Sequence, residues 1–228
     1  MTAAAPAKPR SSPPHRGVWQ RFRAILQVFA AMLAITAFTT VWSRITNDSS
    51  PLPECLGSLA FAGLALHACV AERASTMAAI RQPVGLRHWL HTALAFGALI
   101  AFVEVYFWAA AYVFEILPVL AAFREHGWPP WSAVVLVVAC PAICEELLFR
   151  GFLLTRLIPL LGRRDAWLLQ GTLFAIIHLS PAMLPSHFVA GLVLGHLRLR
   201  TGSLLPGMAV HAAWNLTVTV QEGLLTGW

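Results

Sequence analysis

Two adjacent carboxylates and an arginine interrupt an apolar run in the second half of this chain. Residues 141–150 read Pro-Ala-Ile-Cys-Glu-Glu-Leu-Leu-Phe-Arg. Ionisable groups at membrane depth cost at least about 2–3 kcal/mol each, so they are rare and usually serve a function or pair with one another. On a helix Glu146 and Arg150 lie one turn apart and can form an ion pair, whereas Glu145 points about 100° away. The spacing therefore predicts one carboxylate held as structure and another, Glu145, free for chemistry.

Two later apolar segments carry further polar side chains at helical spacing. Phe174-Ala-Ile-Ile-His178 places an aromatic ring and an imidazole one turn apart, and His211-Ala-Ala-Trp-Asn215 does the same for an imidazole and a carboxamide. Glu145 lies about as far before the intervening turn as His178 lies after it, so an antiparallel hairpin brings them to similar depth. We therefore expect these groups to converge in the core of a helical bundle.

Such a set of groups suits hydrolysis of a peptide bond. A desolvated glutamate could deprotonate a water molecule that one imidazole holds in place. The second imidazole and the carboxamide could donate hydrogen bonds to the developing oxyanion. The competing interpretation is that these side chains only join helices, as polar residues often do in membranes.

The ordered set of motifs also resembles a known family. Glu145-Glu146-x-x-x-Arg150, Phe174-x-x-x-His178 and His211-x-x-x-Asn215 look like the three signature motifs of the CPBP intramembrane proteases. That family includes the type II CAAX prenyl endopeptidases and the ABI family of bacteriocin-processing and immunity proteins. The resemblance spans about residues 130–220.

The resemblance implies a membrane endopeptidase with defined residue roles. In it Glu145 activates water together with His178, and His211 and Asn215 stabilise the oxyanion. The residues that organise the site would be Glu146, Arg150 and Phe174.

The resemblance leaves the cofactor open, because the family has been described both as metalloproteases and as glutamic-type proteases. This sequence has no HExxH motif, which favours the glutamic type and no cofactor. Zinc is the alternative, and its ligands would be Glu145, His178 and His211.

Composition places the chain in the membrane. Of 228 residues, 58% are hydrophobic and 11% are charged, against about 25% charged residues in soluble domains. We expect an all-α polytopic bundle of about seven transmembrane helices with a polar site in its core. The net charge of +6 does not indicate a nucleic-acid partner, because the basic residues fall between apolar segments as topology signals do.

The predicted order is a disordered basic tail (1–20) followed by one transmembrane domain (21–228), whose protease-like core covers about 130–220. A cleaved signal peptide is the competing interpretation of the first apolar segment. Pro141 should kink the fourth segment and leave a backbone carbonyl free near the carboxylates. The seven apolar segments are about 24–42, 55–71, 93–120, 131–156, 165–179, 187–199 and 203–225, with an interfacial connector at about 72–88.

The distribution of Lys and Arg predicts a cytoplasmic N-terminus. With that orientation only Arg44 and Arg124 fall in external loops. The short Ala- and Leu-rich chain with its basic tail is typical of a bacterial inner-membrane protein.

The remaining polar residues receive simpler interpretations. His187 and His196 are expected to be packed or interfacial, and the cysteines, including Cys140 and Cys144, to fill space between helices. Glu104 and Glu115 either line a substrate cavity or pair between helices.

Three functions remain in competition. The first is an endopeptidase that cleaves a membrane-bound or membrane-adjacent protein or peptide. The second is a catalytically silent membrane protein of the immunity type that protects or escorts a partner. The third, a transporter with a carboxylate proton relay, should show an inverted repeat, and this sequence shows none.

Overall fold

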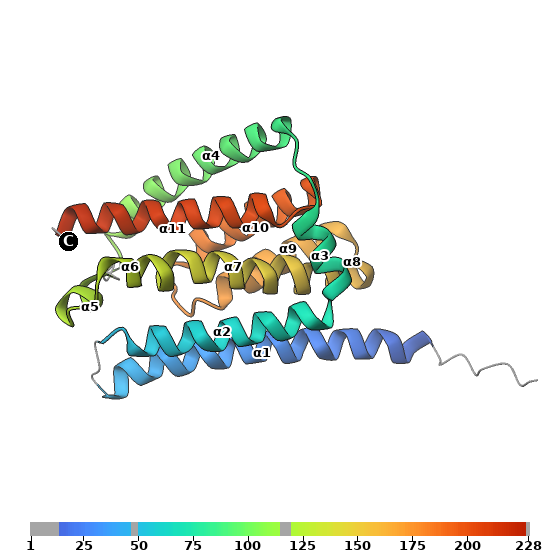
Figure 1. The fold of residues 1–228 in the computed structure, drawn as a ribbon, viewed down its shortest axis with the longest axis horizontal. Coiled ribbons are helices and arrows are strands. Elements are labelled where there is room, and N and C mark those ends of the chain that lie inside the picture. The colour runs from blue at the N-terminus through green and yellow to red at the C-terminus, as the bar shows by residue number, and fades with distance from the viewer. Residues whose placement is uncertain (1–13, 47–49, 115–119, 227–228) are drawn as a thin grey trace, which may run out of the picture.

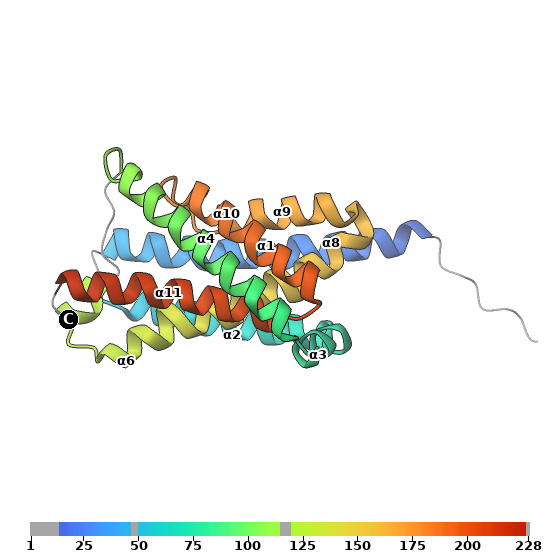
Figure 2. The same ribbon diagram turned by 90° about the horizontal axis from the view of Figure 1, so that it is seen from above.

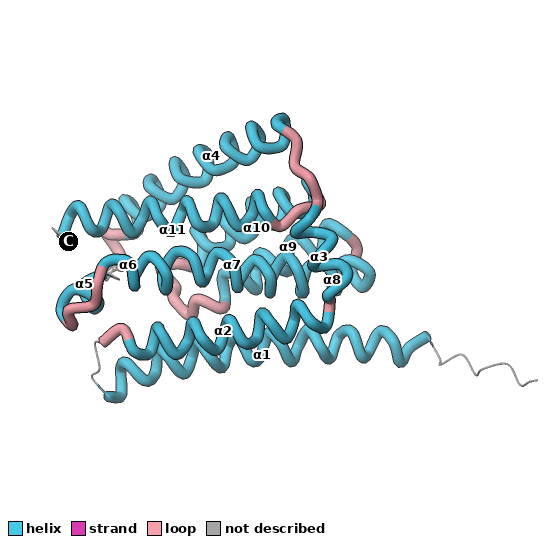
Figure 3. The backbone as a smooth tube through the Cα atoms, viewed as in Figure 1, coloured by secondary structure: helices cyan, strands magenta, loops and turns pink. Residues whose placement is uncertain are grey.

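A computed structural model describes residues 14–46, 50–114 and 120–226 as helices joined by short turns, without a strand in these ranges (Figures 1 and 3). The predicted all-α fold is confirmed. Residues 1–13, 47–49, 115–119 and 227–228 are not described, so most of the predicted basic tail and Glu115 lie outside the described residues. The predicted division into tail and membrane domain stays a prediction.

Eleven α-helices and two π-helical segments make up the described part of the chain. In order they are α1 (Pro14–Thr46), α2 (Leu52–Ala71), α3 (Arg73–Arg81), α4 (Leu86–Ala110), α5 (Leu120–Glu125), α6 (Pro130–Ala133), η1 (Val134–Ala139), α7 (Cys140–Glu146), η2 (Leu147–Leu153), α8 (Leu154–Leu161), α9 (Arg163–Ile176), α10 (Leu184–Thr201) and α11 (Leu205–Thr226).

Four stretches within the described residues are long and apolar enough to cross a bilayer. They are Val18–Trp42 in α1, Leu52–Ala71, Leu86–Ala110, and Pro130–Leu161 from α6 through α8. This establishes a multi-pass membrane protein, but the predicted count of seven spans is not confirmed. The 14 residues of α9 extend only about 21 Å, less than the roughly 30 Å of a bilayer core.

The segment predicted to span about 93–120 is shorter than expected. Its helix, α4, ends at Ala110 and is followed by a turn. On this helix, Glu104 accepts a hydrogen bond from Gln221 of α11 at 2.9 Å. The interhelical pairing, rather than the cavity, is therefore the interpretation that the structure supports for Glu104.

Pro141 lies inside a continuous helical stretch. The turns immediately before it, η1, are π-helical, a widening that is frequent at functional sites. Because proline has no N–H, it cannot bond the carbonyl of Val137 four residues earlier. That oxygen instead accepts a hydrogen bond at 3.0 Å from Asn215 Nδ2 of α11. The freed carbonyl predicted from the sequence is thus bonded by another helix.

The helices form a bundle around the stretch from α6 to α8. Figures 1 and 2 show α1 and α2 as an antiparallel hairpin along one side of that stretch, with α11 along another. The α9–α10 hairpin packs against α11, and α4 lies outermost against α10 and α11. This places α7, which carries both adjacent glutamates, between α2 and α11.

Candidate active site

Glu146 and Arg150 form the ion pair that their spacing predicts. Arg150 Nη1 lies 2.7 Å from Glu146 Oε1, and both side chains are 0% exposed. The guanidinium also donates to the carbonyl of Gly191 at 3.1 Å and lies 4.5 Å from the centre of the Phe174 ring. These contacts compensate the buried charges, although Arg150 Nε and Glu146 Oε2 have no hydrogen-bond partner among the described residues. Removing either charge of the pair would leave the other buried and uncompensated.

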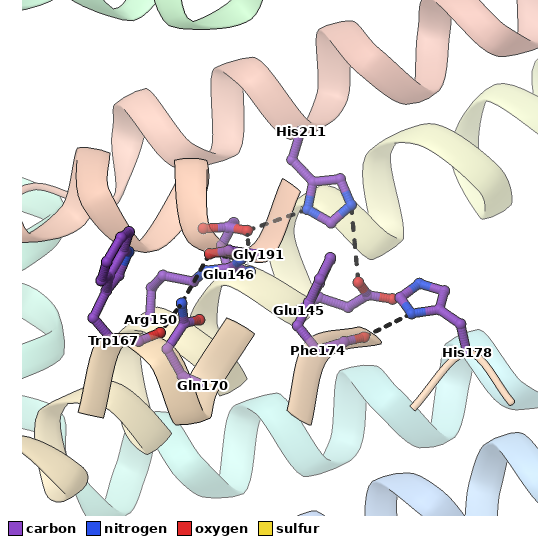
Figure 4. Close-up of polar contacts among 9 residues, drawn as sticks. All are labelled: Glu145, Glu146, Arg150, Trp167, Gln170, Phe174, His178, Gly191 and His211. Atoms are coloured by element: carbon purple, nitrogen blue, oxygen red, sulfur yellow. Dashed lines mark hydrogen bonds and ion pairs between the residues drawn. The ribbon is translucent and has the colours of Figure 1, made fainter. Parts of the chain in front are cut away.

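His211 links the two glutamates that the sequence places on different faces of α7 (Figure 4). Its Nδ1 lies 3.2 Å from Glu146 Oε1, and its Nε2 lies 3.8 Å from Glu145 Oε2. The ion-paired Glu146 can only accept, so Nδ1 carries a hydrogen. A neutral ring would then point a lone pair at the Glu145 carboxylate. At 3.8 Å, Nε2 and Glu145 Oε2 are close enough to form an ion pair when the ring is protonated, but too far apart for a hydrogen bond.

Phe174 orients the imidazole of His178 through its backbone carbonyl and its ring. His178 Nδ1 lies 2.8 Å from the Phe174 carbonyl oxygen, which can only accept, so Nε2 of a neutral His178 is the ring nitrogen with a lone pair. The fully buried Phe174 ring meets the rings of His178, His211 and Phe149 edge to face. This aromatic side chain is the centre about which both histidines are placed.

Glu145 and His178 face a common cavity of about 200 Å³. Glu145 Oε2 is buried without a hydrogen-bond partner among the described residues. The α1–α2 hairpin forms the opposite wall of this cavity, although the sequence resemblance begins only after it. The lining residues on α1 and α2 are Ile35, Thr36, Thr39, Glu54, Gly57, Ser58 and Phe61, and those on the other side include Cys140, Pro141, Cys144 and Ile177.

His211 and Asn215 approach the site from the α11 side and do not line this cavity. Asn215 commits one N–H of its amide to Val137. The amide has a second N–H, which has no partner among the described residues. The structure therefore brings Glu145, His178 and His211 together and places Asn215 one turn further along α11.

Comparison with protein families gives one match. The model of the family described as Rce1-like, type II CAAX prenyl endopeptidase, matches residues 127–217. Residues 127–217 form an Rce1-like domain. The match confirms the family predicted from the motifs and contains every predicted site residue. Comparisons with curated proteins and with solved structures find no match to the chain.

The Rce1-like domain contains a third histidine near the site that the sequence interpretation treated only as a packing residue. The ring centres of His187 and His178 are 3.9 Å apart, and His187 also contacts Phe174 and Trp214. His187 Nδ1 lies 3.0 Å from the carbonyl of Met183. The signal was available: both histidines lie within a few residues of the α9–α10 turn, so the hairpin sets them opposite one another.

Two glycines allow the α9–α10 hairpin of the Rce1-like domain to support Arg150. A Cβ added at Gly191 would lie 2.8 Å from Gly171 Cα, so the two helix backbones are nearly in contact. The Gly191 carbonyl accepts from both Arg150 and Gln170 (2.8 Å). Sequence reasoning missed Gln170, whose type and spacing match no catalytic motif.

The side chains of the Rce1-like domain that could bind a metal ion are not arranged as a metal site. Within the residues that the structure describes, no three His, Cys, Asp or Glu side chains gather closely enough to hold a metal ion. The alternative zinc ligands Glu145, His178 and His211 do not form such a group in this arrangement.

Proposed function

We propose that this protein is an intramembrane endopeptidase that hydrolyses a peptide bond in a membrane-bound or membrane-adjacent protein. The family of the matched domain is one of prenyl endopeptidases by its description. The observation that carries the proposal is the Glu145 carboxylate on the wall of a cavity beside His178, with its Oε2 buried and without a hydrogen-bond partner among the described residues.

In the proposed reaction a water molecule binds between Glu145 and His178. Nε2 of His178 accepts one hydrogen bond from this water, and the Glu145 carboxylate accepts the other. The water oxygen attacks the peptide carbonyl carbon while its proton moves to Glu145. The same carboxyl group then gives the proton to the amine as the C–N bond breaks.

The oxyanion is stabilised from the α11 side. In the proposed reaction both ring nitrogens of His211 carry a proton, and Glu145 enters as the carboxylate. Once Glu145 has taken the proton of the water, the His211 Nε2–H is free to donate to the developing oxyanion, with the second N–H of Asn215 as a further donor. Glu146 orients the His211 ring and stabilises its protonated form, and Arg150 in turn neutralises Glu146.

The test compares Glu145→Gln with the wild-type full-length chain in detergent, on a panel of membrane peptides with different C-terminal tails. The variant should fold with an unchanged melting temperature but cleave at least about 100-fold more slowly, because the general base is gone. Unreduced cleavage by the variant would show that Glu145 is not the base. Peptide binding without cleavage by the wild type would instead support the silent, immunity-type alternative.

We further propose that the reaction needs no cofactor and that the N-terminus faces the cytoplasm of a bacterial inner membrane. Cleavage by purified protein should then persist in the presence of a strong chelator, and metal analysis of active protein should find less than one equivalent. Loss of activity on chelation, restored by added zinc, would reverse the first proposal. Reporter fusions after Trp42 and after Leu161 test the orientation.

A further inference from the structure

A second depression lies between the start of α9 and the end of α10, and it shares no residue with the Glu145 cavity. It has a volume of about 430 Å³. Three guanidinium groups and an indole dominate its walls. The lining residues are Arg163, Arg164, Trp167, His196, Leu199 and Arg200.

The arginines of this depression have no carboxylate partner in the described part of the chain. Other arginines do form ion pairs there, among them Arg150 with Glu146 and Arg156 with Glu72. Arg163 is nevertheless fixed, because its Nη2 donates to the carbonyl of Leu199 at 3.1 Å. Three positive charges thus surround one hollow, and the single carboxylate in the first turn of α9, Asp165, can offset only one of them.

The start of α9 adds to the positive potential. Its first residue is Arg163, its N-cap is Gly162, and no side chain caps its free amides. Basic side chains in a first turn oppose the helix dipole by about 0.3–1 kcal/mol each at low ionic strength. An anion bound here would relieve that repulsion and accept hydrogen bonds from both amides and guanidiniums.

The position of the depression relative to the bilayer indicates which kind of molecule carries the anion. The apolar stretch Pro130–Leu161 ends directly before Gly162, so the arginines that follow lie at the level of the lipid headgroups. The half-buried Trp167 ring is held by its Nε1, which donates to the Leu192 carbonyl at 2.7 Å, and it forms an apolar wall with Leu199. A phosphate that also carries a glycerol and acyl chains fits both kinds of wall.

We propose that this depression binds the headgroup phosphate of an anionic phospholipid. The guanidiniums of Arg163, Arg164 and Arg200 contact the phosphate, and Trp167 and Leu199 contact the glycerol and the first acyl carbons. A lipid with a net negative headgroup is preferred over a zwitterionic one, because a choline group brings a cation to three arginines.

The experiment uses the delipidated full-length protein and native mass spectrometry, titrated with phosphatidylglycerol or phosphatidylcholine. Wild-type protein should retain phosphatidylglycerol selectively. Arg163→Gln/Arg164→Gln/Arg200→Gln should bind it at least about tenfold more weakly, since each basic residue near the surface contributes roughly 1 kcal/mol. Arg200→Gln alone leaves the Arg163–Leu199 hydrogen bond in place and should give a smaller loss in the same direction.

The matched control is Arg73→Gln/Arg81→Gln/Arg87→Gln, which removes three exposed charges from α3 and the start of α4. It should bind phosphatidylglycerol as the wild type does. An equal loss in both triple variants would mean diffuse attraction and overturn the proposal, as would equal retention of the two lipids by wild type. Displacement of the lipid by millimolar inorganic phosphate would assign the site to free phosphate instead.

Discussion

At the scale of single residues, the two adjacent glutamates have different partners and therefore different roles. Glu146 is completely buried and shared between Arg150 and His211, whereas Glu145 has no arginine partner and faces a cavity. Adjacent positions on a helix point about 100° apart, so one helix can direct one carboxylate into the packed core and the next toward a cavity.

Glu146→Gln should therefore lose stability as well as activity, whereas Glu145→Gln should lose activity alone. It leaves the Arg150 guanidinium buried without its counter-charge, which typically costs about 3–5 kcal/mol. We expect a clearly lower melting temperature in detergent together with lost cleavage. A Glu146→Gln protein as stable as the wild type would contradict the assignment of this carboxylate to the framework.

His187 is expected to keep the imidazole of His178, the proposed water-binding residue, in place through ring contact. His187→Ala removes the ring whose centre lies 3.9 Å from that of His178, and the resulting mobility should lower kcat about tenfold with little change in KM. His187→Phe restores a flat ring and should recover most of kcat. The control, His67→Ala, changes an exposed histidine on α2. Equal kcat values for His187→Ala and wild type would show that His187 only fills space.

At the scale of elements, the close approach of α9 and α10 determines where the guanidinium group of Arg150 lies. The Gly191 carbonyl that receives its guanidinium is within reach because neither Gly171 nor Gly191 has a side chain between the helices. Gly207 likewise allows α11 to approach Glu146, since a Cβ at Gly207 would lie 2.6 Å from Glu146 Oε2. Small residues thus bring three helices to one ion pair.

Gly191→Ala should destabilise the fold by about 1–3 kcal/mol, because the added methyl group meets the rigid backbone of Gly171 rather than a flexible side chain. Gly97→Ala on α4 is the matched control. A Cβ at Gly97 meets no atom within 4 Å, and alanine favours a helix over glycine by roughly 0.5–1 kcal/mol. Denaturant unfolding of both variants measures the difference. A Gly191→Ala protein as stable as Gly97→Ala would refute the contact.

At the scale of the whole molecule, the candidate site is larger than the Rce1-like domain. That domain supplies the catalytic candidates, but α1 and α2 lie outside the matched residues and close the cavity from the other side. The carboxylate of Glu54 on α2 joins that of Glu145 on the cavity wall. A substrate bound at Glu145 would therefore contact the N-terminal hairpin as well as α7.

Ser58→Phe tests this wall. Ser58 is buried on the face of α2 toward the cavity, so a phenyl group there should occupy the space that a substrate needs and lower kcat/KM at least about tenfold. Leu59→Phe places a ring on the neighbouring position, which is 64% exposed on the outer face, and should leave kcat/KM unchanged. Equal kcat/KM values for the two variants would place substrate entry elsewhere.

Local periodicity was sufficient for the features that lie within one helix. The apolar composition predicted an all-α membrane protein, and one-turn spacing predicted the Glu146–Arg150 pair and the neighbouring rings of Phe174 and His178. Pro141 predicted a free carbonyl because its missing N–H is a property of the residue itself. Local hydropathy does not determine the count of seven spans, since short helices inside a bundle need not cross the bilayer alone.

Only the tertiary structure decided the contacts between helices. His211 is 65 residues from Glu146, and Asn215 is 78 residues from the carbonyl that it bonds, distances that no sequence period encodes. The same holds for the cavity wall on α2 and for the meeting of Gly171 with Gly191. The sequence alone thus predicts which groups could react, because spacing along one helix sets their faces. Packing between helices decides which of those groups share an ion pair, a carbonyl or a cavity.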